Sequence, residues 1–263
     1  AKKCPLSMVK QIIRPKKYES IDEIKHFIEK NMNKEIEMNG AEIGNEEYIR
    51  IISQKWFNDQ IINYYLQLIK KYAKEVFNTK VYVFSTYFFP SLQSKGVEVV
   101  KKWIEHLGIF DYQFLFFPIH NNSHWSFVTV NLKENDEIEY WDSLDSSYTQ
   151  SFKIENPETE DLPNGMSYRI WTIIRPILLL LRAERFRLKK QLYTTKITKI
   201  RCPQQPNGID CGLYVCLFAR GRICGKTMPY RIRTYELRLK LCYEIMVGEI
   251  VYDFDHQFNE PIH

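Results

Sequence analysis

Apolar residues recur at helical spacing in several parts of the chain. In residues 58–75 they fall every three or four positions, and Asn58 stands where a helix N-cap is expected. Residues 20–32 show the same spacing behind Ser20, and residues 96–107 show it up to Gly108, a residue type that commonly ends helices. These segments are therefore predicted to be helices that each bury one face.

Three stretches rich in β-branched and aromatic residues follow one another between residues 113 and 143. They read QFLFFPIH, WSFVTVNL and EIEYWDS, and clusters of Asn, Ser, Lys and Glu separate them. We expect them to be neighbouring strands of one sheet, with an antiparallel turn near Lys133 to Asp136. KVYVF and YTTKITKI predict two further strands, and Gly40 and Gly44 indicate a short polar hairpin.

The second half of the chain combines polar loops with long apolar runs. The stretch from Ser146 to Asn164 is polar and acidic, which predicts a surface loop. Residues 166–190 predict a helix that is kinked or begins near Pro176. A buried helix is expected after Cys211, and YELRLKLCYEIMVGEI predicts the last one.

This mixed order of helices and strands, without internal repeats, predicts an α+β fold with a central mixed sheet flanked by helices. No linker is long enough to require two independent domains. We expect a lysine-rich helical arm over residues 1–34 and a single domain, the candidate catalytic domain, over residues 35–263.

Composition supports a folded protein with a sizeable core. The 263 residues are 44% hydrophobic and 14% aromatic. The longest apolar run, IWTIIRPILLLL, contains Arg175 and Pro176 and is too short to cross a bilayer, so no membrane span is predicted. The start of the chain has no apolar signal core and no initial Met, so we expect a trimmed sequence whose targeting signals could be missing.

Charge and cysteine usage narrow the compartment and the partners. The net charge of +5 favours acidic partners only slightly, and the basic run RAERFRLKK is expected to be a solvated helix face rather than a nucleic-acid patch. Six cysteines without a CxxC pair do not suggest a disulfide framework. A reducing, intracellular compartment fits best.

One cysteine stands in a polar, glycine-flanked setting. In QQPNGIDCGLYVC, Cys211 begins the predicted buried helix, where free amide groups and the helix dipole favour a thiolate. Gly208 and Gly212 permit close backbone approach at such a turn. Cys211 is therefore a candidate nucleophile, whereas the remaining cysteines are interpreted as core residues: Cys4, Cys202, Cys216, Cys224 and Cys242.

A cysteine nucleophile needs a base, a group that orients the base, and donors for the oxyanion. His124 begins the strand WSFVTVNL and Asp142 ends the strand EIEYWD, so antiparallel pairing would bring the two side chains together. Gln205 precedes Cys211 by six residues and offers a side-chain amide that could join the Cys211 backbone amide as an oxyanion donor.

Three other residues and a metal site are alternatives to this set. His120 is interpreted as structural, Asp145 falls past the strand end, and Asp210 is expected to make turn bonds. A metal site built from His120, His124 and Cys211 lacks a familiar ligand spacing, and none is predicted.

The segments SHWSFVTVNLKENDEIEYWDSL and CPQQPNGIDCGLYVC resemble the His-Trp, Asp-Ser and Gln-x5-Asp-Cys-Gly signatures of the Ulp/SENP family of SUMO-specific cysteine proteases. WFNDQIINYY is similar to another segment of that family, with Phe57 where leucine is usual. The resemblance runs from about Glu35 to Val251. It implies a papain-like cysteine protease fold of the ubiquitin-like protease type.

The resemblance also implies roles for individual residues. His124 would be the general base, Asp142 its orienting carboxylate, Cys211 the nucleophile and Gln205 the oxyanion donor. Trp56 and Trp125 match two tryptophans that close over the Gly-Gly tail of the modifier, and Asp59 matches a position near that tail. Without the resemblance, both tryptophans would be interpreted as core residues.

The implied activity is hydrolysis of peptide and isopeptide bonds after the C-terminal Gly-Gly of SUMO, both in precursors and in conjugates, by a monomer without cofactor. The expected partners are SUMO or a related modifier and its conjugates, without nucleic acid. The expected location is the nucleus, the nuclear periphery or the cytoplasm, or a host cell for a secreted effector. Alternatives are a protease for ubiquitin or another modifier, an acetyltransferase with the same triad, and a silent modifier-binding protein.

Overall fold

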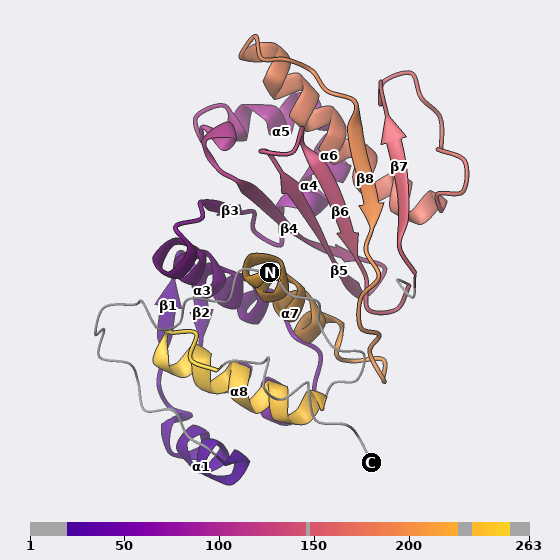
Figure 1. Cartoon of the computed structure of the whole chain (residues 1–263). Coiled ribbons are helices and arrows are strands. Elements are labelled where there is room, and N and C mark those ends of the chain that lie inside the picture. Colours follow the sequence, from indigo (N-terminus) through magenta and orange to yellow (C-terminus); the bar gives the residue numbers. More distant parts are fainter. Residues whose placement is uncertain (1–19, 146–147, 226–232, 253–263) are drawn as a thin grey trace. The chain divides into compact units, whose positions relative to one another are not determined.

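The structure is a computed structural model that describes residues 20–145, 148–225 and 233–252 (Figure 1). The chain forms two compact units. Of the described residues, the first unit contains those before Lys80, those from Asp142 to Asp145, and those from Cys202 onward. The second unit contains 80–141 and 148–201.

A mixed sheet organises the second unit (Figure 1). Its strands lie in the order β3-β4-β5-β6-β8-β7; β3 pairs with β4, and β6 with β8, in parallel, and the other neighbours are antiparallel. The strands are β3 (Val81–Val83), β4 (Phe114–Asn121), β5 (His124–Asn131), β6 (Glu137–Trp141), β7 (Gln150–Ile154) and β8 (Thr195–Lys199). The predicted α+β arrangement is confirmed.

The three successive strands predicted from residues 113–143 are confirmed as β4, β5 and β6. The β5–β6 pair is antiparallel, with Phe127 opposite Trp141 and Asn131 opposite Glu137. Asn135 and Asp136 in the connecting turn have positive φ, a conformation that asparagine and aspartate tolerate better than most residues. The expected turn therefore fixes the register of these two strands.

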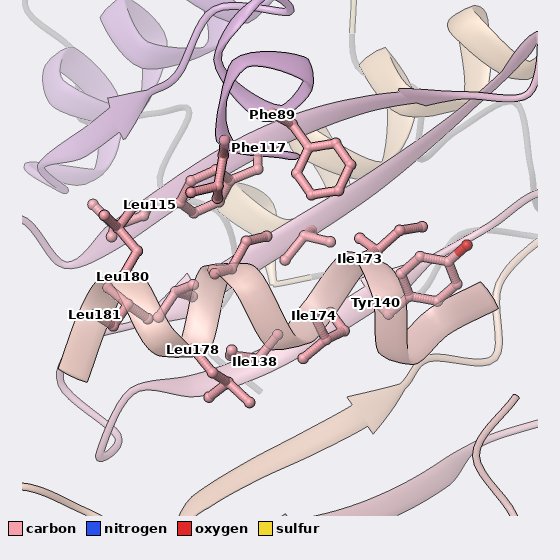
Figure 2. Close-up of a cluster of buried hydrophobic side chains, with 14 of the residues drawn as sticks. Phe89, Leu115, Phe117, Ile138, Tyr140, Ile173, Ile174, Leu178, Leu180 and Leu181 are labelled. Atoms are coloured by element: carbon pink, nitrogen blue, oxygen red, sulfur yellow. The ribbon is translucent and has the colours of Figure 1, made fainter. Parts of the chain in front are cut away.

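Helices α4 (Phe88–Lys95), α5 (Val97–Ile104) and α6 (Tyr168–Arg187) pack against this sheet, and a short 3₁₀ turn spans Ile109–Asp111. Figure 2 shows α6 side chains such as Ile174 and Leu178 meeting strand residues such as Leu115 and Ile138. These side chains are almost fully buried. Burial of this apolar surface is the main force that holds the unit together.

Helices dominate the first unit. They are α1 (Ile21–Asn31), α2 (Asn45–Ile52), α3 (Asp59–Phe77), α7 (Cys211–Cys224) and α8 (Thr234–Val247), joined by a hairpin of β1 (Ile36–Met38) and β2 (Ala41–Ile43). α3 packs on α7, and both α1 and α2 pack on α8. Residues 211–220 of α7 are all buried, as expected for a helix that is apolar on every side.

Predicted caps and turns in this unit are confirmed. Ser20 accepts a hydrogen bond from the Glu23 backbone amide, and Asn58 accepts one from Ile61. Asn39 and Gly40, both with positive φ, form the hairpin turn. No helix in the described ranges combines the length and apolarity that a membrane span requires.

Four sequence predictions need correction. The loop expected from Ser146 to Asn164 contains the edge strand β7, whose apolar Phe152 and Ile154 are buried. The helix predicted over residues 166–190 is present as Tyr168–Arg187, but the alternative that it begins near Pro176 is wrong, because Ser167 caps its start and Pro176 lies inside it. Residues 146–147, within the same loop, lie outside the described residues, as do residues 1–19 of the expected arm.

The third correction concerns the helix predicted over residues 96–107: α5 ends at Ile104, and two of its apolar residues, Val99 and Trp103, are exposed. The fourth concerns the basic run near residue 185. Arg185 is buried in a two-bond ion pair with Asp136, so this part of α6 is not simply a solvated face. Helices α2 and α4 were not predicted, since both are short.

Candidate active site

Cys211 is the first residue of α7 and is buried, with 3% of its surface exposed. Asp210 precedes it, and the Asp210 carbonyl accepts the first backbone hydrogen bond of the helix from Tyr214 at 3.0 Å. The early amide groups of a helix have no partner within the helix, and they carry its partial positive charge. Cys211 therefore lies where the sequence predicted it.

Asn207 organises the turn that leads to Cys211. Its side-chain oxygen accepts hydrogen bonds from the backbone amides of Ile209 (3.0 Å) and Asp210 (3.1 Å), and its amide nitrogen donates to the Asp210 carboxylate at 2.8 Å. An asparagine side chain that bonds backbone amides two and three residues ahead stabilises such a turn. Sequence reasoning missed Asn207, although the pair Asn207-Gly208 is a common turn signal.

Gly212 follows the cysteine because its neighbours leave no room for a side chain. A β-carbon at position 212 would lie 2.7 Å from the Phe57 β-carbon and 3.3 Å from the Ile62 side chain. Gly208, in contrast, has no atom within 4 Å of the corresponding position. The prediction that a glycine permits close approach is thus confirmed at Gly212 and not at Gly208.

Gln205 is buried and its side-chain amide is held at both ends. The Ser143 hydroxyl donates to the Gln205 oxygen at 2.5 Å, and the Gln205 nitrogen donates to the Asn207 carbonyl. The Gln205 backbone amide donates to the Ser143 carbonyl at 2.8 Å. An amide nitrogen carries two hydrogens, so one hydrogen remains for a further acceptor beside the Asn207 carbonyl.

Asp142 is fully buried in the same unit as Gln205 and Cys211. Its carboxylate accepts a hydrogen bond from the Leu144 backbone amide at 2.9 Å. Its carbonyl accepts bonds from the Cys202 thiol at 3.3 Å and the Gln204 amide at 3.1 Å. Asp142 is therefore tied, within the first unit, to the segment that leads to Cys211.

His124 begins β5 in the second unit, directly after a two-residue turn. Asn122 and Ser123 both have positive φ, and Asn121 pairs with His124 across the hairpin. Such two-residue turns match the twist of the strands they join. His124 is half-buried. Its approach to Asp142 and Cys211 stays a prediction.

Trp125 follows His124 and is buried, with its ring centroid 4.5 Å from that of His120. The imidazole of His120 thus packs on an indole, which agrees with its structural interpretation. The burial of Trp125 agrees with the core interpretation. Its role near a modifier tail stays a prediction.

Trp56 is not a core residue, because 49% of its surface is exposed. Its indole N–H donates to the Gly208 carbonyl at 2.9 Å, which fixes the ring on the turn before Cys211. Asp59 is the first residue of α3 and is half-buried, a favourable place for an acidic residue near the helix N-terminus.

The other described cysteines differ from Cys211 in their surroundings. Cys202, Cys216 and Cys242 are buried, and burial raises the pKa of the Cys216 and Cys242 thiols well above the ordinary range. These thiols stay protonated and unreactive near neutral pH. The core interpretation is confirmed for these three, whereas Cys224 is half-buried and Cys4 lies outside the described residues.

Comparison with known proteins identifies the family. A sequence model of the Ulp1 protease family, C-terminal catalytic domain, matches residues 55–246. A sentrin-specific protease of Caenorhabditis elegans is 29% identical over 215 residues, which cover 74% of this chain and 26% of that protein. Sentrin-specific protease 2 of Pongo abelii is 30% identical over 197 residues, covering 74% and 31%. The chain spans less than a third of the length of these relatives.

Among solved structures, the yeast C-terminal Ulp1 protease domain in complex with Smt3, the yeast orthologue of SUMO, has the same fold. The TM-score is 0.65 at 22% sequence identity, and the alignment covers 86% of this chain and 93% of that one. The family match covers most of the chain and includes Trp56, His124, Asp142, Gln205 and Cys211. The resemblance seen in the sequence is confirmed: this chain belongs to the Ulp1 protease family.

Proposed function

We propose that this chain is a cysteine protease that hydrolyses peptide and isopeptide bonds after the C-terminal Gly-Gly of SUMO. The observation that carries the proposal is Cys211 at the first position of α7, behind a turn fixed by Asn207, within the part that matches the family. The proteins it resembles include sentrin-specific proteases and an Ulp1 domain bound to a SUMO orthologue. Both processing of precursors and removal from conjugates follow from one bond-breaking chemistry.

In the proposed reaction, the Cys211 thiolate attacks the carbonyl carbon of the terminal glycine. A carbon–sulfur bond forms, and the carbon–nitrogen bond breaks as protonated His124 gives its proton to the leaving amine. A water molecule then attacks the thioester: a carbon–oxygen bond forms, His124 takes one proton from the water, and the carbon–sulfur bond breaks. This step restores the thiolate and releases the modifier's carboxylic acid, which loses its remaining proton to solvent. Asp142 orients the His124 ring and stabilises its charged form.

The oxyanion of each tetrahedral intermediate would accept hydrogen bonds from the Cys211 backbone amide and the free hydrogen of the Gln205 amide. Preorganised donors of this kind commonly contribute more than any other single group. The support is the rigidity of Gln205, whose amide already bonds Ser143 and Asn207 before any substrate binds. No metal or organic group is required by this chemistry.

Trp56 and Trp125 are proposed to flank the diglycine tail, with Asp59 near it. A slot between two flat rings admits glycine and excludes residues with a β-carbon, so it selects the tail by its shape. The support is the exposed Trp56 ring, which a hydrogen bond fixes beside the turn that carries Cys211.

The remaining features of the proposal are the domain boundary, the oligomeric state and the location. We propose that residues 35–263 form the catalytic domain, that it acts as a monomer, and that it works inside the cell, in the nucleus, the nuclear periphery or the cytoplasm. The segment 146–162 and residues 1–34 are candidates for tuning which modifier binds.

The test is a panel of modifier probes that carry an electrophile at the C-terminus. We expect a SUMO probe to label Cys211 and a Cys211→Ala variant to stay unlabelled. Labelling by a ubiquitin probe and not by a SUMO probe would identify ubiquitin as the modifier and leave the proposed reaction unchanged. Transfer of label from acetyl-CoA, without any probe labelling, would instead support the acetyltransferase alternative.

A further inference from the structure

A buried arginine on α8 contacts both segments that surround Cys211 in the first unit. Arg238 has 0% of its side chain exposed. Its Nε donates to the Asp210 carboxylate at 2.7 Å, and its Nη2 lies 2.6 Å from the same oxygen. Asp210 directly precedes Cys211, so the guanidinium is anchored to the start of α7.

The other end of the guanidinium holds the segment that carries Trp56. Nη1 donates to two backbone carbonyls, of Ile51 at 3.2 Å and Lys55 at 2.9 Å. The Ile51 carbonyl belongs to the last turn of α2, where a cation is favourable, and it also accepts a hydrogen bond from the Gln54 amide at 3.4 Å. The guanidinium carbon also lies 4.7 Å from the Phe57 ring centroid, a cation–π contact.

Two further contacts join these two segments directly. The Trp56 indole bonds the Gly208 carbonyl, and Phe57 packs on the Gly212 backbone. Residues 51–57, the Trp56 segment, are thus held against residues 207–212, the Cys211 turn, at three points. Of these three points, only the bridge made by Arg238 requires a planar side chain with several donors.

Burial of the Arg238 guanidinium costs free energy, because it removes a charged group from water. Burial lowers the pKa of Arg238, while the nearby Asp210 carboxylate favours its charged form. A buried ion pair often stabilises a fold no better than apolar residues of similar size. A buried arginine that donates to three acceptors and contacts the Phe57 ring beside the Cys211 turn is therefore better explained by positioning than by stability.

We propose that Arg238 is a positioning residue that couples the Cys211 turn to the Trp56 segment, and so aligns the nucleophile with the slot for the modifier tail. The proposal rests on the proposed function, because it needs Cys211 as nucleophile and Trp56 in the slot. Lysine at position 238 could keep the ion pair with Asp210 but could not bond the two carbonyls at the same time.

The test compares Arg238→Lys with the wild-type chain on a fluorogenic SUMO substrate and on iodoacetamide, a small reagent that needs no slot. We expect kcat/KM for SUMO hydrolysis to fall about tenfold or more, because misplacement of about 1 Å can cost up to a hundredfold. The rate of Cys211 alkylation by iodoacetamide is expected to stay within about twofold, since the Asp210 ion pair remains.

A double-mutant cycle with Trp56→Phe separates positioning from general loss of structure. If Arg238 acts through the Trp56 segment, the double variant will lose little more than the more damaging single variant, because residues that act as one unit are not additive. Arg220→Lys is the matched control. Arg220 is also a buried arginine of the first unit, but it bonds Glu244 and Tyr65. It should keep kcat/KM within about twofold below its melting temperature.

Three results would overturn the proposal: Arg238→Lys within twofold of wild type, effects that multiply in the cycle, or an equal loss in Arg220→Lys. If Arg238→Lys does not fold, Asp210→Asn takes its place in the same cycle with the same expectation. Failure of the SUMO probe to label the wild-type chain would overturn the proposed function itself, which distinguishes the two outcomes.

Discussion

Phe57 lies against the backbone of Gly212, so close that a β-carbon at position 212 would be 2.7 Å from the Phe57 β-carbon. The two residues are 155 positions apart in the chain. Each has a neighbour of functional interest, since Trp56 precedes Phe57 and Cys211 precedes Gly212. The contact therefore sets the spacing between an exposed indole and the candidate nucleophile.

Gly212→Ala is expected to damage both stability and activity. The added methyl group would have to displace Phe57, and overpacking of this kind typically costs about 1–3 kcal/mol. Urea unfolding should report the loss of free energy, and SUMO hydrolysis should fall with it because Trp56 moves together with Phe57. Gly208→Ala is the matched control, since open space surrounds that position. Equal effects of the two variants would contradict this account.

Trp56→Phe is expected to lower kcat/KM because phenylalanine keeps a flat ring but loses the N–H that bonds the Gly208 carbonyl. A hydrogen bond of this kind contributes about 0.5–1.5 kcal/mol, which corresponds to a loss of about twofold to tenfold. Trp103→Phe serves as control, because Trp103 is similarly exposed on α5 in the other unit. A Trp56→Phe variant as active as the control would speak against the fixed indole.

Ser143→Ala is expected to lower kcat without abolishing it. The Ser143 hydroxyl is the donor that holds the Gln205 oxygen, and a buried carbonyl left without its partner costs about 1–3 kcal/mol. The Gln205 amide would then lose its fixed orientation, and kcat should fall about tenfold, less than the hundredfold or more expected for Gln205→Ala. Steady-state hydrolysis of SUMO measures both, and an unchanged kcat in Ser143→Ala would refute the link.

Cys211→Ala is expected to eliminate hydrolysis, by a factor on the order of 10⁶ as in other nucleophile deletions, while the modifier still binds. Isothermal calorimetry with SUMO and a fluorogenic assay measure the two properties. Cys224→Ala is the control, since this cysteine is half-buried at the far end of the same helix. Residual turnover in Cys211→Ala would assign the chemistry to another residue.

The stability of the chain is expected to fall as the pH rises above about 8.5, the ordinary pKa of a cysteine thiol. Burial raises the pKa of the Cys216 and Cys242 thiols, so the folded chain keeps protons that the unfolded chain releases. Each group then removes about 1.4 kcal/mol per pH unit, and the stabilisation is complete below that pH.

Urea unfolding between pH 7 and 10, under reducing conditions, measures this dependence. A Cys216→Ala/Cys242→Ala double variant should show a shallower decline than the wild-type chain, because it has two fewer groups that titrate differently in the two states. Buried Tyr65 has a raised pKa as well and adds a decline at higher pH in both proteins. Parallel pH profiles would contradict the assignment.

Helices could be predicted from the sequence where apolar spacing and capping residues gave a strong signal. The spacing of apolar residues and the caps Ser20 and Asn58 predicted α1 and α3, because both signals lie within a few residues of the helix they form. Strand β7 was missed because its segment is mostly polar, and only pairing with β8 and burial of Phe152 and Ile154 make it a strand.

In the candidate site, too, the residues close together in sequence could be predicted and the contacts between distant residues could not. The glycine-flanked Cys211 and the nearby Gln205 were visible in the sequence, because the turn and the helix start that hold them are adjacent. The partner of Gln205 was not visible, since Ser143 is 62 residues away. Nor was that of Asp210, which was expected to make turn bonds and also pairs with Arg238, 28 residues further along.

The sequence by itself determined which chemical groups the chain carries, which segments become helices or strands, and which family the chain resembles, because periodicity, capping and motif spacing are local properties. Only the tertiary structure decided that Phe57 forces a glycine at position 212, that Ser143 holds Gln205, and that Arg238 joins the Cys211 turn to the Trp56 segment. These contacts join residues distant in sequence, and they exist because packing of the first unit brings their segments together and leaves buried polar groups that must find partners.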